Sequence, residues 1–195
     1  MAMTGEGTKP LKIERLVPEK RQGLIVVITG YGKGKTTSAL GMALRACGHG
    51  MKTCIIQFIK GDFHAGEWGG IKKLDCDVEL IATGKGFCCI QGNHYPFEEH
   101  RANAQDAIRL AREKMASGRY DMLILDEINN ALHLKLVDLE QVLDLIDRKP
   151  PLMHLILTGR DAHLRVIELA HTVSEVREIK HAYRQGIKPQ PGVDY

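Results

Sequence analysis

The chain has 195 residues, of which 44% are hydrophobic, and a formal net charge of +3. This length suits one domain with a buried core, and so small a net charge gives no argument for nucleic-acid binding. No apolar stretch approaches the roughly 20 residues that span a bilayer, and the polar segment 1–20 lacks the apolar core of a secretory signal, so we expect a cytoplasmic protein without membrane contact.

Residues 1–22 contain glycines and prolines that interrupt regular structure, so we predict an N-terminal arm ahead of one domain over 23–195. The first half of that domain alternates apolar strands with one helix and a glycine-rich loop. The predicted strands are 24–29, 52–58 and 78–82, the helix is 35–47, and the loop is 60–70. An irregular segment over 83–93 follows the third strand.

The second half continues the alternation. Helices are predicted over 97–117, 136–147 and 162–170, and strands over 122–125, 152–157 and 172–180. Continuous apolar strands alternating with helices indicate an α/β fold with a mainly parallel sheet and helices on both faces. Ligands of such sheets bind at the carboxyl ends of the strands, where the polar motifs of this chain lie.

The strongest motif is a glycine-rich segment directly after the first strand. Its residues are Gly30, Tyr31, Gly32, Lys33, Gly34, Lys35, Thr36 and Thr37. A strand, a glycine-rich turn and a helix N-terminus in this order predict a phosphate-binding loop, in which backbone N–H groups and Lys35 hold the anion and the Thr36 hydroxyl holds Mg²⁺. Thr29 occupies the position of the usual first glycine, and Lys33 is an additional lysine.

The second motif is the acidic end of the strand that closes on Asp126 and Glu127. Magnesium prefers oxygen ligands and takes one or two carboxylates together with phosphate oxygens. Either acid could be the direct ligand, and the other could act through water or a hydrogen bond. We therefore predict Thr36, Asp126 and Glu127 as the metal site, with Lys35 and Glu127 as catalytic residues.

Three further residues are weaker candidates. Lys33 is either solvated or neutralises part of a triphosphate, and Arg160 is either a surface residue or a nucleotide contact. Phe87, in the irregular segment, either packs on the core or contacts a ligand.

The cysteine and histidine content gives no metal or disulfide framework. The five cysteines form no C-x-x-C pair, which suggests reduced thiols, and Cys88 and Cys89 with His94 and His100 have no zinc spacing.

These motifs together resemble the ATP:corrinoid adenosyltransferases that carry a phosphate-binding loop, also called the cob(I)alamin adenosyltransferase family. The resemblance runs along most of the chain from residue 23 to 195. The matching stretches are 30–37, 45–50, 57–61, 66–67, 82–84, 86–87, 125–128, 157–160, 172–175, 180–182 and 192–195. So many matches in the same order are far more specific than a phosphate-binding loop alone.

The resemblance implies a RecA-like P-loop fold and a defined reaction. The cobalt(I) of a reduced corrinoid attacks the 5′ carbon of ATP, the adenosylcorrinoid forms, and tripolyphosphate leaves, in adenosylcobalamin synthesis or salvage. It further implies that residues 30–36 bind the triphosphate, that Phe87 lies at the corrinoid site, and that the N-terminal arm closes over the nucleotide. A homodimer, bound Mg²⁺ and an electron-donating reductase belong to the same expectation.

Two positions depart from the family pattern. Cys89 stands where an aromatic residue is common, and Tyr31 where asparagine is common. The first leaves the preferred corrinoid open. Two other classes are a RecA-like ATPase or kinase that acts at the γ-phosphate and a nucleotide-binding regulator without turnover; the reaction products distinguish all three.

Overall fold

The computed structural model describes residues 20–61, 65–86 and 95–195. Six strands form one sheet in the order β3-β2-β4-β5-β1-β6, and every pairing between them is parallel. The strands are β1 (Ile25–Thr29), β2 (Thr53–Gln57), β3 (Val78–Ala82), β4 (Met122–Asp126), β5 (His154–Thr158) and β6 (Thr172–Glu175). The predicted α/β fold with a mainly parallel sheet is confirmed.

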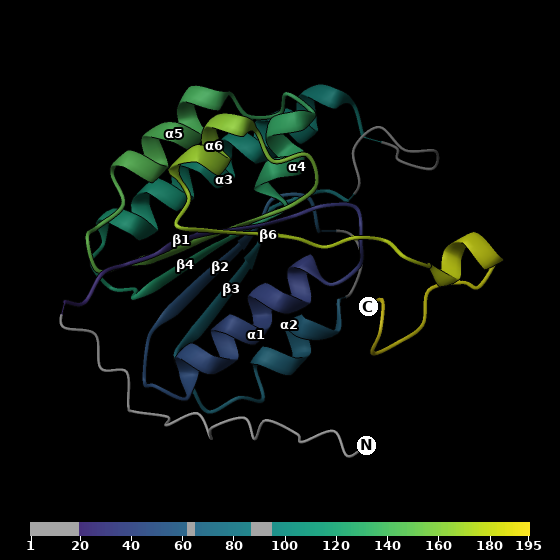
Figure 1. Cartoon of the computed structure of the whole chain (residues 1–195), viewed down its shortest axis with the longest axis horizontal. Coiled ribbons are helices and arrows are strands. Elements are labelled where there is room, and N and C mark those ends of the chain that lie inside the picture. The colour runs from purple at the N-terminus through teal and green to yellow at the C-terminus, as the bar shows by residue number, and fades with distance from the viewer. Residues whose placement is uncertain (1–19, 62–64, 87–94) are drawn as a thin grey trace, which may run out of the picture.

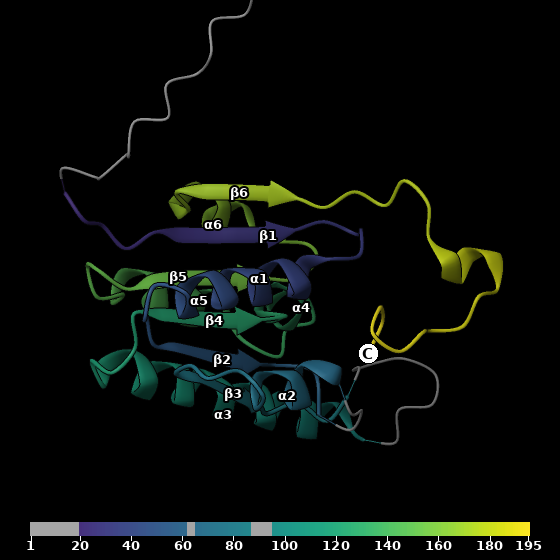
Figure 2. The same ribbon diagram turned by 90° about the horizontal axis from the view of Figure 1, so that it is seen from below.

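Helices cover both faces of the sheet (Figure 1, Figure 2). One face carries α1 (Lys35–Cys47) and α2 (Gly66–Ile71). The other carries α3 (Phe97–Ala116), α4 (Ile128–His133), α5 (Leu139–Asp147) and α6 (Leu164–Leu169). A short 3-10 helix, η1 (Ala182–Gln185), follows β6 at a distance from the sheet. None of the helices in the described ranges is long and apolar enough to cross a membrane.

A hydrophobic core lies on each face of the sheet, and β1 contributes side chains alternately to both. Ile25 and Val27 pack into the core under α3, α5 and α6, whereas Val26 and Ile28 pack against α1 on the opposite face. Successive side chains of a strand point to opposite faces, and in a parallel sheet covered by helices both faces are apolar. The continuous apolar runs of the sequence therefore correspond to buried strands.

Several elements differ from the prediction in their boundaries or in their type of secondary structure. Residues 66–71 form a helix within the predicted loop, and α4 follows the acidic motif without a break. The helix predicted from 136 begins at Leu139, where Gln141 Oε1 accepts a hydrogen bond from the Asp138 N–H at 2.9 Å, as in a capping box. The final strand ends at Glu175 rather than near 180 because its pairing with β1 ends at Thr29.

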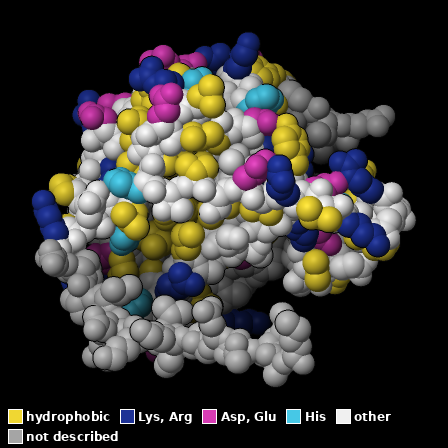
Figure 3. All heavy atoms as spheres, in the orientation of Figure 1, with side chains coloured by type: hydrophobic (Ala, Val, Ile, Leu, Met, Phe, Trp, Pro, Cys, Tyr) yellow, Lys and Arg dark blue, Asp and Glu magenta, His cyan; other side chains and the backbone are white. Residues whose placement is uncertain are grey.

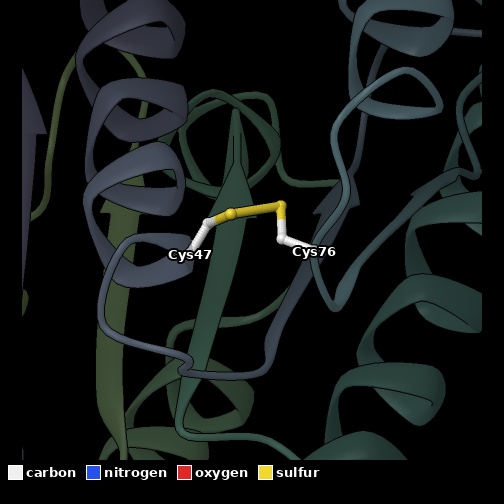
Figure 4. The surroundings of a disulfide bond; sticks show 2 residues. All are labelled: Cys47 and Cys76. Atoms are coloured by element: carbon white, nitrogen blue, oxygen red, sulfur yellow. A yellow bond between two sulfur atoms is a disulfide. The ribbon is translucent and has the colours of Figure 1, made fainter.

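Cys47, the last residue of α1, and Cys76, in the loop before β3, form a disulfide with Cα atoms 5.6 Å apart (Figure 4). The prediction of reduced thiols is wrong for this pair. The two residues are 29 positions apart, so local spacing gave no sign of their proximity. Cys54 is free and buried, and burial raises the pKa of its thiol to about 12.

Candidate functional site

The glycine-rich segment forms a turn between β1 and α1. Gly34 has φ 120° and precedes the first helical residue, and its carbonyl accepts the Ser38 N–H at 2.8 Å. Gly30 has φ 95°. Residues with a side chain rarely adopt these backbone angles, so the backbone conformation alone requires glycine at both positions.

Close packing is a second requirement at Gly30 and also requires glycine at position 32, which the sequence did not reveal. The chain that leaves β6 lies directly against them: the Gly32 N–H donates to the Val176 carbonyl at 2.7 Å. A Cβ on Gly30 would lie 2.5 Å from the Val176 oxygen, and one on Gly32 would lie 2.6 Å from the Arg177 oxygen. The absence of side chains at Gly30 and Gly32 therefore leaves room for the backbone of residues 176–177.

Lys35 and Thr36 begin α1 and face the interior of the loop. Lys35 is only 7% exposed, and its Nζ donates to the Gly32 carbonyl at 2.8 Å. Burial, and to a lesser degree the charges of Arg160 and Lys33, lower the pKa of this ammonium, although Glu127 and Asp126 oppose the shift. The Thr36 hydroxyl donates to Asp126 Oδ1 at 2.9 Å. The loop and the acidic strand end are therefore in direct contact.

Asp126 is 1% exposed and surrounded by donors. Its Oδ1 accepts from Thr36 and from the Thr158 hydroxyl at 2.6 Å, and its Oδ2 accepts from Gln57 Nε2 at 3.1 Å. Buried carboxylates are stable where such donors replace water. Both oxygens of Asp126 are thus engaged in holding β2, β4, β5 and the loop together.

Glu127 has a different environment. Its backbone is left-handed, with φ 65°, and its N–H donates to Thr158 Oγ1 at 3.0 Å. Burial, with the neighbouring Asp126 charge, raises the pKa of its carboxyl group to about 7. This side chain, rather than that of Asp126, lines the pocket beside the phosphate-binding loop.

That pocket has a cavity volume of about 370 Å³ and opens at the carboxyl end of the sheet. Its lining contains six predicted site residues: Lys33, Gly34, Lys35, Thr36, Thr37 and Glu127. It also contains residues to which we assigned no role: Leu40, Lys60, Gly66, Glu67 and the segment 192–195.

Lys60 and Glu67 belong to a polar network on the β2 side of the pocket. Lys60 Nζ donates to Glu67 Oε1 at 2.8 Å, and Gln57 Nε2 donates to the same oxygen at 3.2 Å. Burial alone would raise the pKa of Glu67, but hydrogen bonds from Lys60, from the backbone and from Gln57, together with the Lys60 charge, outweigh it and leave the pKa lowered. Gln57 connects this network to Asp126.

The path of Lys60 is fixed by two glycines in neighbouring loops. The Cβ positions of Gly61 and Gly84 fall on the backbone of Gly84 and Ile59, respectively, so neither position has room for a side chain. The Gly84 N–H donates to the Lys60 carbonyl at 3.1 Å. Both glycines lie in stretches that matched the family, and this was the only signal in the sequence for this part of the site.

The remaining predicted site residues lie elsewhere. Tyr31 and Arg160 are outside the lining of this pocket and contact each other, with the guanidinium 5.5 Å from the ring centroid. The Tyr31 hydroxyl donates to Asp161 Oδ1 at 2.6 Å. The Arg160 charge nevertheless acts on Lys35 and Glu127, since it lowers the pKa of both. Phe87 lies outside the described residues.

Comparison with known proteins adds an independent finding. Residues 21–195 match the model of the family described as ATP:corrinoid adenosyltransferase BtuR/CobO/CobP. The chain is 38% identical over 177 residues to the corrinoid adenosyltransferase of Escherichia coli (strain K12), an alignment that covers 91% of this chain and 88% of that one. It is 35% identical over 182 residues to the corrinoid adenosyltransferase CobA of Salmonella typhimurium (strain LT2), with the same coverage.

Among solved structures, the chain is similar to the KaiC-like protein PH0186 from Pyrococcus horikoshii OT3. That match has a TM-score of 0.47 and 17% sequence identity, and it covers 82% of this chain and 75% of the other.

Proposed function

The chain belongs to the ATP:corrinoid adenosyltransferase family, and on this premise we propose that its phosphate-loop pocket holds the triphosphate of ATP while the adenosyl group passes to a corrinoid. The observation that carries the proposal is the convergence of Lys33, Lys35, Thr36 and Glu127 on one pocket after β1 and β4. Its charged and hydroxyl groups suit a polyphosphate rather than an apolar ligand.

In the proposed reaction, the cobalt(I) of the corrinoid substrate supplies the electron pair. A cobalt–carbon bond forms at the 5′ carbon of ATP, the bond from that carbon to oxygen breaks, and tripolyphosphate leaves with the bonding electrons. Charge builds on the departing oxygen, so fixed positive groups around the phosphates stabilise the transition state. Lys35, Lys33 and Lys60 are the ammonium groups at this pocket. The protein supplies position and charge rather than a nucleophile.

The donor set of the site fits Mg²⁺. The Thr36 hydroxyl and the Glu127 carboxylate are hard oxygen donors in contact with one pocket, and magnesium usually adds only one or two protein ligands to its phosphate and water ligands. Asp126 would act indirectly, because both of its oxygens already accept hydrogen bonds from protein groups. When bound, the ion would neutralise phosphate charge.

Product analysis tests the reaction. The protein is incubated with ATP, Mg²⁺ and a chemically reduced corrinoid, and phosphate products are separated by ion-exchange chromatography. We expect tripolyphosphate in equal amount to a light-sensitive adenosylcorrinoid. ADP and phosphate formed without any corrinoid product would instead support an ATPase or kinase, and binding without either product would support a regulator.

Further features of the proposal rest on the family resemblance. They are a homodimer, an electron-donating reductase as partner, a corrinoid contact at Phe87 and closure of the arm 1–22 over the nucleotide. A cytoplasmic location is proposed from the sequence of segment 1–20. Light scattering during size-exclusion chromatography tests the dimer: a mass of one chain would overturn it.

A further inference from the structure

The segment after β6 returns to the phosphate-binding loop. It leaves the sheet, forms η1, and turns back so that its end lies beside α1 and α2 (Figure 1, Figure 2). Basic and acidic side chains gather on this projecting part of the surface (Figure 3). We call residues 188–195 the tail; four of its residues, 192–195, line the pocket that contains Lys35 and Glu127.

The tail is folded into a compact turn by its own hydrogen bonds. The Asp194 N–H donates to the Gln190 carbonyl at 2.8 Å, and Asp194 Oδ2 accepts the Gln190 N–H at 2.8 Å. The Gly192 N–H donates to the Tyr195 carbonyl at 2.8 Å. The turn therefore presents the second carboxylate oxygen of Asp194 in a defined direction.

That oxygen is bound to the phosphate-binding loop. Asp194 Oδ1 lies 2.7 Å from Lys33 Nζ, and the two side chains are 24% and 42% exposed. The hydrogen bond from Lys33, followed by that from the Gln190 backbone, lowers the pKa of Asp194, so this acid is charged at neutral pH. The backbone of Tyr195 also approaches α2, since a Cβ on Gly66 would lie 3.4 Å from the Tyr195 carbonyl carbon.

The lysines of the pocket are therefore already occupied by protein oxygens. Lys33 is paired with Asp194, Lys60 is paired with Glu67, and Lys35 donates to the Gly32 carbonyl. An entering polyphosphate must share or replace these partners. The pair formed by Lys33 and Asp194 is the more exposed of the two ion pairs, and exposed pairs contribute little to stability because water and salt screen them.

We propose that Asp194 competes with polyphosphate for Lys33, so that the tail determines how tightly the pocket holds the triphosphate of ATP and the tripolyphosphate that leaves. A phosphate chain with several negative charges displaces one exposed carboxylate and repels it. After transfer, the return of Asp194 to Lys33 favours release of the product. The assignment of that product rests on the proposed function.

The experiment uses the full chain and inorganic tripolyphosphate, with binding measured by isothermal titration calorimetry. Asp194→Asn is the informative variant, because an asparagine carbonyl oxygen still accepts the Gln190 N–H and preserves the turn while the charge is lost. We expect this variant to bind tripolyphosphate about two- to fivefold more tightly than the unchanged protein. Equal or weaker binding would overturn the proposal, and weaker binding would show that Asp194 instead orients Lys33 toward the phosphate.

A double-variant comparison shows whether the effect passes through Lys33. In a Lys33→Ala background, Asp194→Asn is expected to change the dissociation constant by less than twofold, because the competition has been removed. The same gain in both backgrounds would mean a general charge effect and would overturn the proposed competition. Glu178→Gln is the matched control, since Glu178 is an ion-paired acid on the same segment, bound to Arg184, outside the pocket lining.

This test is separable from the test of the reaction. If the unchanged protein forms no adenosylcorrinoid, the proposed reaction fails while the binding result for Asp194→Asn stands. If transfer proceeds normally and Asp194→Asn leaves tripolyphosphate affinity unaltered, only the proposed competition fails.

Discussion

Asp126 and Glu127 are adjacent acids, but their different environments give them different roles. Asp126 accepts three side-chain hydrogen bonds and holds Thr36, Thr158 and Gln57 in place. Glu127 has a left-handed backbone that carries its side chain to the pocket, where burial raises its carboxyl pKa to about 7. The first acid organises the site, and the second is available to a metal ion or ligand.

The raised pKa of Glu127 has a cost in stability. A carboxyl group titrating near 7 in the folded protein and near 4.5 in the unfolded chain favours folding below about pH 4.5, and this contribution is lost as the pH rises through 7. At pH 8, without nucleotide or metal, we expect Glu127→Gln to raise the free energy of unfolding by up to about 3 kcal/mol, measured by denaturant titration. At pH 5 the same substitution should raise it little. Transfer activity should fall sharply in the same variant. Equal stability at pH 8 would contradict the burial argument.

Lys35 is expected to contribute mainly to the chemical step. It is buried at the base of the loop and already close to Gly32, so little ordering is needed for it to meet a phosphate. Lys35→Ala should lower kcat by about 10²–10³-fold in a coupled assay of adenosylcorrinoid formation. Lys52→Ala, at an exposed lysine paired only loosely with Asp77, serves as control and should retain normal rates. A normal rate in Lys35→Ala would refute its role.

At the scale of elements, the phosphate-binding loop and the chain after β6 form one packed unit. Gly32→Ala would place a methyl group 2.6 Å from the Arg177 carbonyl oxygen, a backbone atom that cannot rotate away. We expect a loss of about 1–3 kcal/mol in the free energy of unfolding, measured by urea titration, together with weaker ATP binding. Stability equal to that of the unchanged protein would show that residues 175–177 move freely.

Gly41 provides the matched comparison within the same region. It lies in the middle of α1, and a Cβ there meets no atom within 4 Å. Gly41→Ala should therefore raise stability by about 0.5–1 kcal/mol through helix propensity. If Gly32→Ala lowers the free energy of unfolding and Gly41→Ala raises it, the effect of close packing is distinguished from that of helix propensity.

The disulfide connects two further elements, the end of α1 and the loop that leads into β3. Closing a loop of 29 residues contributes roughly 3–4 kcal/mol in the chain-entropy model. Dithiothreitol should lower the melting temperature, and Cys47→Ser should lower it by a similar amount without further response to the reductant. A melting temperature that does not respond to dithiothreitol would show that the bond contributes nothing to stability.

At the scale of the whole molecule, the parts predicted from sequence are those that depend on local pattern. The apolar runs identified β1, β2, β4 and β5, because buried parallel strands consist largely of such residues. The edge strand β6 was also predicted, although its four residues are exposed. The motifs after β1 and β4 meet at one pocket because the carboxyl ends of parallel strands share an edge of the sheet.

The parts that were missed depend on contacts between distant segments. The approach of Asp194 to Lys33, the bond between Cys47 and Cys76, and the pairing of Lys60 with Glu67 have no periodicity or spacing of their own. The sequence predicts a loop where α2 forms, because three of the six residues of this helix are glycine, which intrinsically disfavours helix. Packing of the complete chain, rather than local preference, determines these features.

The contact of Gly30 and Gly32 with residues 176–177 implies a rule for the evolution of the family. A side chain at either glycine position is compatible only with a different path of the backbone after β6. Across an alignment of relatives, we therefore expect substitutions at positions 30 and 32 to occur together with insertions or deletions near 175–178, and expect little such covariation for Gly34, whose Cβ would be nearly unobstructed. Substitutions in the phosphate-binding loop would thus be accompanied by changes in the segment after β6, about 145 positions further along the chain.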